Sequence, residues 1–227
     1  MPHDFTRRWR NARYVANYLQ FTAPVSPNPR EWSTRLRVGS TSTVLDLGCG
    51  EAKVLAAISP GIELGIGVDA SPHMVRAGRR HATDRRAENV SLVQADFRRL
   101  PVPSESIDAA LSNAALHHVP DEGKLQCLNE LARVLRPGSL FYLRDDAFNF
   151  DPRELEGLQP QIYGEFEREF GVYGWAFLRD HLAGADFECT PYTSDLLALL
   201  EAAGFKIRES TPTGLDGVEI LAVRSAA

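Results

Sequence analysis

Apolar positions along the chain gather in short runs, and segments with a polar and an apolar face separate one run from the next. The runs that read as buried strands are short, and most have a glycine or an aspartate at one end; they cover residues 44–47, 64–68, 90–96, 107–113, 139–145, 205–210 and 218–224. Helical spacing and end signals are found over residues 4–20, 31–37, 51–58, 71–84, 121–135 and 193–203. The alternation predicts an α/β fold with a doubly wound, mostly parallel, seven-stranded sheet.

Two segments depart from this alternation. Residues 1–42 combine a helical pattern with several prolines, so we expect an N-terminal helical appendage there, and residues 43–227 form the main domain. Residues 148–191 are rich in Phe, Tyr, Trp, Gly and Pro and carry only a weak helical pattern at 153–170. We expect this stretch to be a substrate cap inserted into the domain.

Composition and charge narrow the classes of protein. A chain of 227 residues with 44% hydrophobic content can bury one substantial core but is too short for two ordinary domains and linkers. The net charge of -5 argues against broad attraction to nucleic acid or anionic lipid. Arg7, Arg8, Arg10 and Arg13 alternate with aromatic residues and could bind phosphates, but we favour the solvated face of an amphipathic helix.

The cysteines and the lack of long apolar runs bear on the compartment. Cys49, Cys127 and Cys189 are odd in number and have no metal-ligand spacing, which favours a reduced, intracellular protein. No apolar run reaches the roughly 20 residues that cross a bilayer, and no signal-peptide core follows the basic start. We expect a cytoplasmic protein that binds neither nucleic acid nor membrane, and that is a monomer or a homodimer.

A glycine-punctuated turn after the first strand carries the strongest chemical signal. Gly48 and Gly50 have no Cβ, so a ligand can pack directly on the backbone of the turn, and Asp69 ends the next strand, where it could accept both hydroxyls of a ribose. Asp46 precedes the first glycine; it would repel a pyrophosphate but could hold an ammonium. Ala52 occupies the third glycine position. S-adenosylmethionine therefore fits this turn better than NAD.

The chain resembles the class I S-adenosylmethionine-dependent methyltransferases, of the small-molecule type found in ubiquinone and menaquinone biosynthesis. The resemblance covers roughly residues 43–223 and rests on five motifs in order. They are Val44-Leu45-Asp46-Leu47-Gly48-Cys49-Gly50, Gly67-Val68-Asp69-Ala70-Ser71-Pro72-His73-Met74, Gln94-Ala95-Asp96-Phe97, Ala115-Leu116-His117-His118-Val119 and Arg133-Val134-Leu135-Arg136-Pro137-Gly138. A Rossmann-like methyltransferase fold is implied.

The resemblance also implies a set of cofactor contacts. The methionine end would lie against the first turn, the ribose on the second strand, the adenine beside the third, and the reacting methyl group near the fourth; the residues are Asp46, Gly48, Cys49, Gly50, Asp69, Ala70, Met74, Asp96, Phe97 and Asn113. Plain structural roles stay open beside these. Cys49 reads most simply as a small apolar filler, Asp69 and Asp96 could cap a following turn, and Met74 could be core.

Methyl transfer needs alignment more than it needs a catalytic side chain, because the cofactor carries the reactive group. A base is required only when the acceptor must lose a proton. The candidates follow the fourth and fifth strands or lie in the cap; they are His117, His118, Asp146 and His181. We expect no metal, because Ser112 and Asn113 stand where metal-dependent relatives have an Asp.

The predicted function is methylation of a small molecule, apolar or aromatic in part, with an oxygen acceptor slightly favoured over nitrogen or carbon. Methylation of nucleic acid or protein is an alternative, but Asn113 is followed by Ala114-Ala115 and not by two prolines and an aromatic residue. A cofactor-binding protein without transfer activity is another alternative, because fold alone does not decide function.

Overall fold

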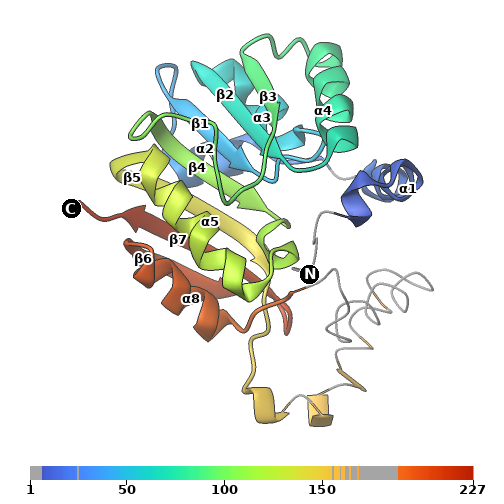
Figure 1. Cartoon of the computed structure of the whole chain (residues 1–227), viewed down its shortest axis with the longest axis vertical. Coiled ribbons are helices and arrows are strands. Elements are labelled where there is room, and N and C mark those ends of the chain that lie inside the picture. The colour runs from blue at the N-terminus through green and yellow to red at the C-terminus, as the bar shows by residue number, and fades with distance from the viewer. Residues whose placement is uncertain are drawn as a thin grey trace.

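The computed structural model describes residues 7–24, 26–154, 156–158, 160–161, 164, 168 and 189–226. Within them, seven strands form one sheet in the order β3-β2-β1-β4-β5-β7-β6 (Figure 1). The strands are β1 Thr43–Leu47, β2 Leu64–Asp69, β3 Val90–Gln94, β4 Ile107–Asn113, β5 Leu135–Asp146, β6 Phe205–Pro212 and β7 Gly217–Arg224. Only β7 runs antiparallel to its neighbours, so the predicted mostly parallel seven-stranded sheet is confirmed for the described residues.

Helices cover both faces of the sheet, as a doubly wound fold requires. One face carries α5 (Asp121–Val134) and α8 (Thr193–Ala202), and the other carries α2 (Pro29–Leu36), α3 (Lys53–Ile58) and α4 (Pro72–Asp84). The described residues also include four short 3-10 turns; they are η1 Arg8–Arg10, η2 Ser59–Gly61, η3 Leu116–His118 and η4 Pro152–Glu154. Helix α1 (Ala12–Thr22) lies beyond the carboxyl ends of the parallel strands, next to α4 (Figure 1).

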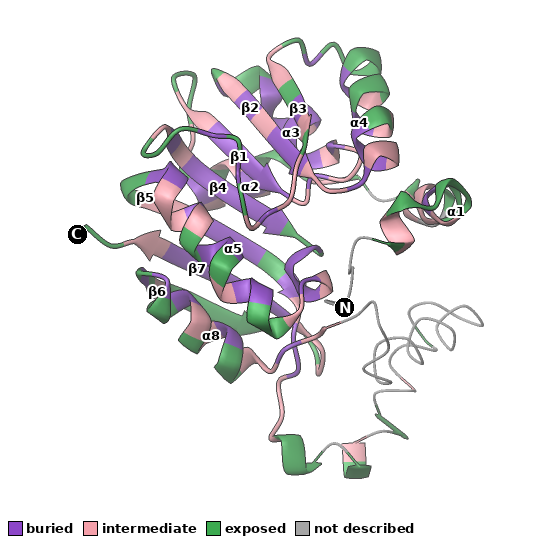
Figure 2. Ribbon diagram, in the orientation of Figure 1, coloured by how far each residue is buried: buried purple, intermediate pink, exposed green. Residues whose placement is uncertain are grey.

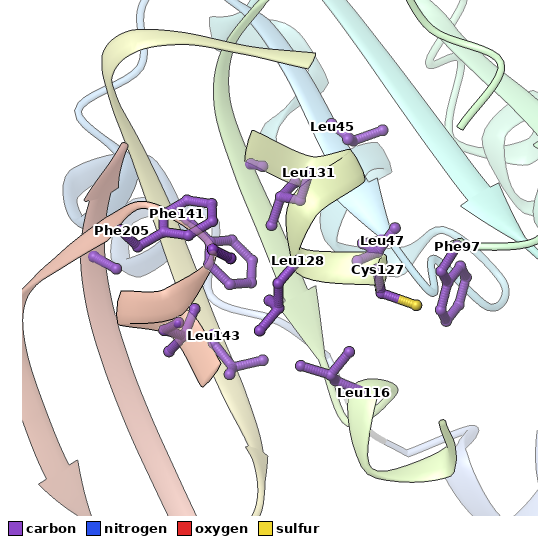
Figure 3. Close-up of a cluster of buried hydrophobic side chains, with 14 of the residues drawn as sticks. Leu45, Leu47, Phe97, Leu116, Cys127, Leu128, Leu131, Phe141, Leu143 and Phe205 are labelled. Atoms are coloured by element: carbon purple, nitrogen blue, oxygen red, sulfur yellow. The ribbon is translucent and has the colours of Figure 1, made fainter. Parts of the chain in front are cut away.

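The core consists of two apolar layers separated by the sheet. In β1, Leu45 and Leu47 point toward α5, while Val44 points toward α2 and α3, which is the alternation of a strand buried on both faces. Figure 3 shows the first layer, where Phe141 and Leu128 pack between β5 and α5. The inner strands are buried along most of their length and the outer helix faces are exposed (Figure 2).

The N-terminal helix expected over residues 4–20 is broken, and that prediction was wrong. Asn11 has extended backbone angles (φ -88°, ψ 113°) and separates η1 from α1. Its side-chain oxygen accepts hydrogen bonds from the amides of Arg13 (3.0 Å) and Tyr14 (3.1 Å). Asparagine is among the best N-caps, so it starts a new helix in preference to continuing an old one.

The fifth strand begins earlier than the expected residue 139. Leu135 already pairs with Ile107, and the ladder then resumes at Leu140 opposite Ala109. The residues between form a bulge, in which Gly138 adopts a φ of +82°. Arg136-Pro137-Gly138 therefore kinks the strand and does not separate helix from strand.

The two ends of the expected inserted cap lie side by side. Phe148 forms a parallel bridge with Tyr192, and its amide donates to the carbonyl oxygen of Pro191 (2.9 Å). Most of the segment between them lies outside the described residues. Within the predicted helical stretch at 153–170, residues 156–158, 160–161, 164 and 168 are described and are helical, and Pro152–Glu154 forms η4. The domain thus closes on itself where the insertion leaves and returns.

Candidate functional site

A pocket opens at the carboxyl ends of β1, β2 and β4. It lies at the point where the strand order reverses, between β1 and β4, which is where ligands bind in open α/β sheets. The lining residues are Trp9, Tyr18, Thr22, Asp46, Gly48, Cys49, Gly50, Glu51, Lys53, Val54, Asp69, Ala70, Met74, Phe97, Asn113, Ala114, Ala115 and His118. Nine of the ten residues predicted to contact the cofactor are brought together in this pocket, and Asp96 is the exception.

The turn after β1 is as tight as its glycines suggest. Gly48 has a φ of +82°, and a Cβ added there would lie 2.2 Å from the Cβ of Ala115. The amides of Gly48 and Cys49 both donate to the carbonyl oxygen of Val68, at 2.8 Å and 3.1 Å. Because these amides are already bonded to β2, they are not free to bind a pyrophosphate, which argues against a dinucleotide.

Asp69 joins the two turns that border the pocket. One carboxylate oxygen accepts from the amide of Gly50 (2.9 Å), and the other accepts from the amide of Ser71 (2.8 Å). Burial raises the pKa of Asp69 to about 6, and the two amide bonds limit that rise. Asp69 therefore has a fixed orientation, and its remaining lone pairs can accept from a ligand in the pocket.

Asp46 is the buried carboxylate at the floor of the pocket. Its exposed fraction is 2%, and its carboxylate receives no hydrogen bond from the part of the chain that the structure describes. Burial, and after it the charge of Asp69, raises the pKa of Asp46 to about 8. A buried carboxylate without donors is stabilised by a cationic ligand, and an ammonium group would supply both the charge and the hydrogen bonds.

Asp96 points elsewhere. Its carboxylate is paired with Arg98, which donates from Nε (3.0 Å) and Nη2 (2.6 Å). Burial alone would raise the pKa of Asp96, but the bonds from Arg98 hold it below its usual value. The expected contact of Asp96 with an adenine amino group stays a prediction, and it would require the carboxylate to leave Arg98.

The two histidines after β4 have different surroundings. His118 lines the pocket and packs against the indole of Trp9, with 5.0 Å between the ring centroids. His117 is 3% exposed, and its Nδ1 lies 2.5 Å from Asp145 and its Nε2 lies 3.7 Å from Asp146. Of the predicted catalytic candidates, His118 is the one that faces the pocket, whereas His181 lies outside the described residues.

Sequence reasoning missed the N-terminal side of the pocket. Trp9 and Tyr18 line it, so the interpretation of this segment as a solvated helix face was wrong for these two side chains. The carbonyl oxygen of Trp9 accepts from Ser71 Oγ (2.5 Å), and that of Thr22 accepts from Lys53 Nζ (2.6 Å). The aromatic residues among the arginines were the only local signal, because no periodicity links residues so far apart in the sequence.

The sequence of residues 44–138 matches the family described as a methyltransferase domain. Residues 44–138 therefore belong to the class I S-adenosylmethionine-dependent methyltransferases. An uncharacterized methyltransferase YcgJ of Bacillus subtilis is 37% identical over 109 residues, which are 48% of this chain and 42% of that protein. The crystal structure of YcgJ superimposes on 87% of this chain and 97% of its own, with a TM-score of 0.68 at 19% identity.

Two further relatives of the methyltransferase domain have named activities. A demethylmenaquinone methyltransferase of Listeria monocytogenes is 35% identical over 112 residues, 48% of this chain and 46% of the relative. A carboxy-S-adenosyl-L-methionine synthase of Erwinia tasmaniensis is 31% identical over 139 residues, 59% of this chain and 55% of the relative. The chain thus spans about half the length of the curated relatives that it matches.

Two features are absent from the described part of the chain. No helix among the described residues has the length and apolar character needed to span a membrane. No group of three or more His, Cys, Asp or Glu side chains in the described part of the chain could hold a metal ion.

Proposed function

We propose that this methyltransferase domain binds S-adenosylmethionine in the pocket and transfers its methyl group to a small-molecule acceptor. The observation that carries the proposal is the charge of the pocket: Asp46, Glu51 and Asp69 face one lysine, Lys53, which is itself paired with Glu51 at 2.9 Å. A lining with an excess of carboxylates favours a ligand with a sulfonium and an ammonium over a dinucleotide.

The predicted contacts fit this ligand in a consistent way. Asp46 would hold the ammonium, Asp69 the ribose hydroxyls, and Phe97 and Met74 would border the adenine. The methyl group would then point toward Trp9 and His118, which also line the pocket. Their rings supply an apolar surface and a group able to accept a proton, as an acceptor with a partly apolar body and an ionisable hydroxyl requires.

Catalysis in this scheme rests mainly on alignment. Holding the acceptor and the methyl group at near-attack distance can lower the barrier by roughly 7–11 kcal/mol. We expect an oxygen acceptor ahead of nitrogen or carbon. We assign His118 as the candidate base, because it is the predicted catalytic residue that lines the pocket. The relationship to a demethylmenaquinone methyltransferase supports a small-molecule acceptor, and that to a carboxy-S-adenosyl-L-methionine synthase keeps a reaction other than methyl transfer as the alternative.

Calorimetric titration with S-adenosylmethionine, S-adenosylhomocysteine and NAD tests the cofactor. We expect the two adenosyl compounds to bind and NAD not to bind. Asp69→Ala should weaken binding at least about tenfold, because it removes a charged acceptor from the ribose, while Asp84→Ala on the exposed face of α4 should leave binding unchanged. Binding of NAD alone, or equal affinities for the two variants, would contradict the proposal. Formation of S-adenosylhomocysteine with a panel of phenols and quinols then separates transfer from binding alone.

A further inference from the structure

Lys124 of α5 is fully buried, with 0% of its surface exposed, although lysine is almost never buried without partners. Its Nζ donates to the carbonyl oxygens of Val119 (2.6 Å) and Cys189 (2.5 Å) and to the carboxylate of Asp121 (2.8 Å). An ammonium has three protons, so these three acceptors satisfy it completely.

The acceptors belong to two segments that are far apart in the sequence. Val119 directly follows η3, the turn that carries His117 and His118. Cys189 precedes α8 in the segment that returns from the insertion, and its amide donates to the carbonyl oxygen of His117 (2.8 Å). Lys124 therefore ties the returning segment to the histidine turn on the helix side of that turn.

The sheet side of the same turn is held by Asp145. One of its carboxylate oxygens accepts from the amides of Leu116 (2.7 Å) and His117 (3.3 Å), and the other lies 2.5 Å from His117 Nδ1. The turn is thus held by buried side chains of two different elements, α5 and β5, and His118 is the member of the turn's histidine pair that faces the pocket.

We propose that Lys124 is a positioning residue whose ammonium holds the η3 turn, and with it the ring of His118, in place beside the pocket. The proposal rests on the proposed function only for the role of His118 toward an acceptor. Without the ammonium, two carbonyl oxygens would lose a charged donor, and the turn would lose the bond through Val119 that links it to α5 and to the returning segment. The ring of His118 would then sample other orientations.

The test uses Lys124→Met, which replaces the ammonium-bearing side chain with an unbranched apolar side chain one atom shorter. The control is Lys206→Met, because Lys206 is exposed on β6. In nuclear magnetic resonance spectra, with His118→Asn to assign the ring, we expect Lys124→Met to shift or broaden the signals of His118. Hydrogen exchange of the amides of residues 117–119 should become about tenfold faster, the equivalent of one lost hydrogen bond. Lys206→Met should leave both readouts unchanged.

Cofactor affinity distinguishes a displaced η3 turn from a general loss of structure in the Lys124→Met variant. Affinity for S-adenosylhomocysteine should stay within about threefold of the unchanged protein, because neither Lys124 nor its three acceptors line the pocket. A folded Lys124→Met with unchanged His118 signals and exchange would overturn the proposal. If that variant does not fold, Lys124→Gln, whose uncharged amide has only two N–H donors for the three acceptors, is measured in the same way, and no change there overturns the proposal too. Failure of the unaltered protein to bind S-adenosylhomocysteine would count against the proposed function and leave this test intact.

Discussion

At the scale of single residues, Asp46 sets the electrostatics of the pocket. The carboxylate is buried and has no described hydrogen-bond donor, so the folded protein holds a proton on it that the unfolded chain would release near its usual pKa. A cationic ligand reverses this preference, because it stabilises the charged form. Binding of S-adenosylmethionine should therefore release a proton from Asp46, and affinity should rise with pH up to about 8.

The variant Asp46→Asn tests this coupling. The pKa of Asp46 in the folded protein, about 8, is above its value in the unfolded chain, so the free energy of unfolding contributed by Asp46 is greatest below about pH 4 and declines as the pH rises toward 8. Asn cannot ionise, so Asp46→Asn should raise the free energy of unfolding at pH 8 by about 2 kcal/mol or more and weaken binding. Urea unfolding of the variant and the unaltered protein at pH 5 and pH 8 measures this effect. If the free energy of unfolding changes between pH 5 and pH 8 by the same amount in both proteins, the prediction is wrong.

The residues of the site were predictable to the extent that their signals are local. Gly48, Gly50 and Asp69 follow strands at fixed distances, so their place at one edge of the sheet follows from the alternation of strand and helix. Trp9 reaches the pocket through a contact with Ser71, sixty-two positions away, and no short pattern encodes such a contact. The pairing of Asp96 with Arg98 was also missed, although an arginine two positions on was a visible signal.

At the scale of elements, end signals decide where helices begin and stop. Asn28 caps α2 and Pro29 is its first residue, as the asymmetry of helix ends favours. At the other end, Arg37 adopts a left-handed conformation (φ 52°, ψ 40°), and its amide donates to Ser33 and Thr34. This is the position at which glycine is usually found, so an arginine there is under strain.

We predict that Arg37→Gly stabilises the protein. Glycine adopts the left-handed region without a steric cost, and the exposed side chain of Arg37 has no ion pair within the described residues, so the gain should be about 1 kcal/mol. Arg30→Gly, in the first turn of the same helix, should instead cost about 0.5–1 kcal/mol. Thermal or urea unfolding of the two variants gives the comparison, and a loss of stability in Arg37→Gly would contradict it.

At the scale of the whole molecule, the N-terminal segment completes the pocket that the sheet begins. Bonds to α4 and α3 hold it there: Ser71 Oγ donates to the carbonyl oxygen of Trp9, and Lys53 Nζ donates to that of Thr22. The indole of Trp9 contacts Tyr14, Tyr18 and His118. A segment held by two hydrogen bonds and by aromatic packing should open slowly, so it should slow the release of a ligand that it covers.

Trp9→Ala should therefore speed the release of S-adenosylhomocysteine about tenfold and change its association rate much less. Arg13→Ala, on the exposed side of the same segment, serves as the control. Stopped-flow displacement experiments measure both rates. Equal release rates for the two variants would mean that Trp9 does not cover the ligand.

The overall sheet could be predicted from the sequence because strand and helix alternate so regularly up to residue 146. The same pattern does not say that β7 enters the sheet between β5 and β6. That arrangement depends on which faces are left to bury once α8 has packed, a property of the complete molecule. The break at Asn11 and the bulge before Leu140 are local, and they were missed because a helical or apolar pattern outweighed a cap and a glycine.

The place of β7 has a consequence for synthesis. When the ribosome has synthesised β5 and β6, β5 lacks one of its two neighbours and β6 lacks the strand with which it pairs, because that strand, Gly217–Arg224, is still to be made. Until then the backbone N–H and C=O groups along that edge of β5 are unpaired and able to pair with other chains. Closure of the sheet between β5 and β6 depends on β7, so chaperones that shield strand edges should matter most before β7 has been synthesised.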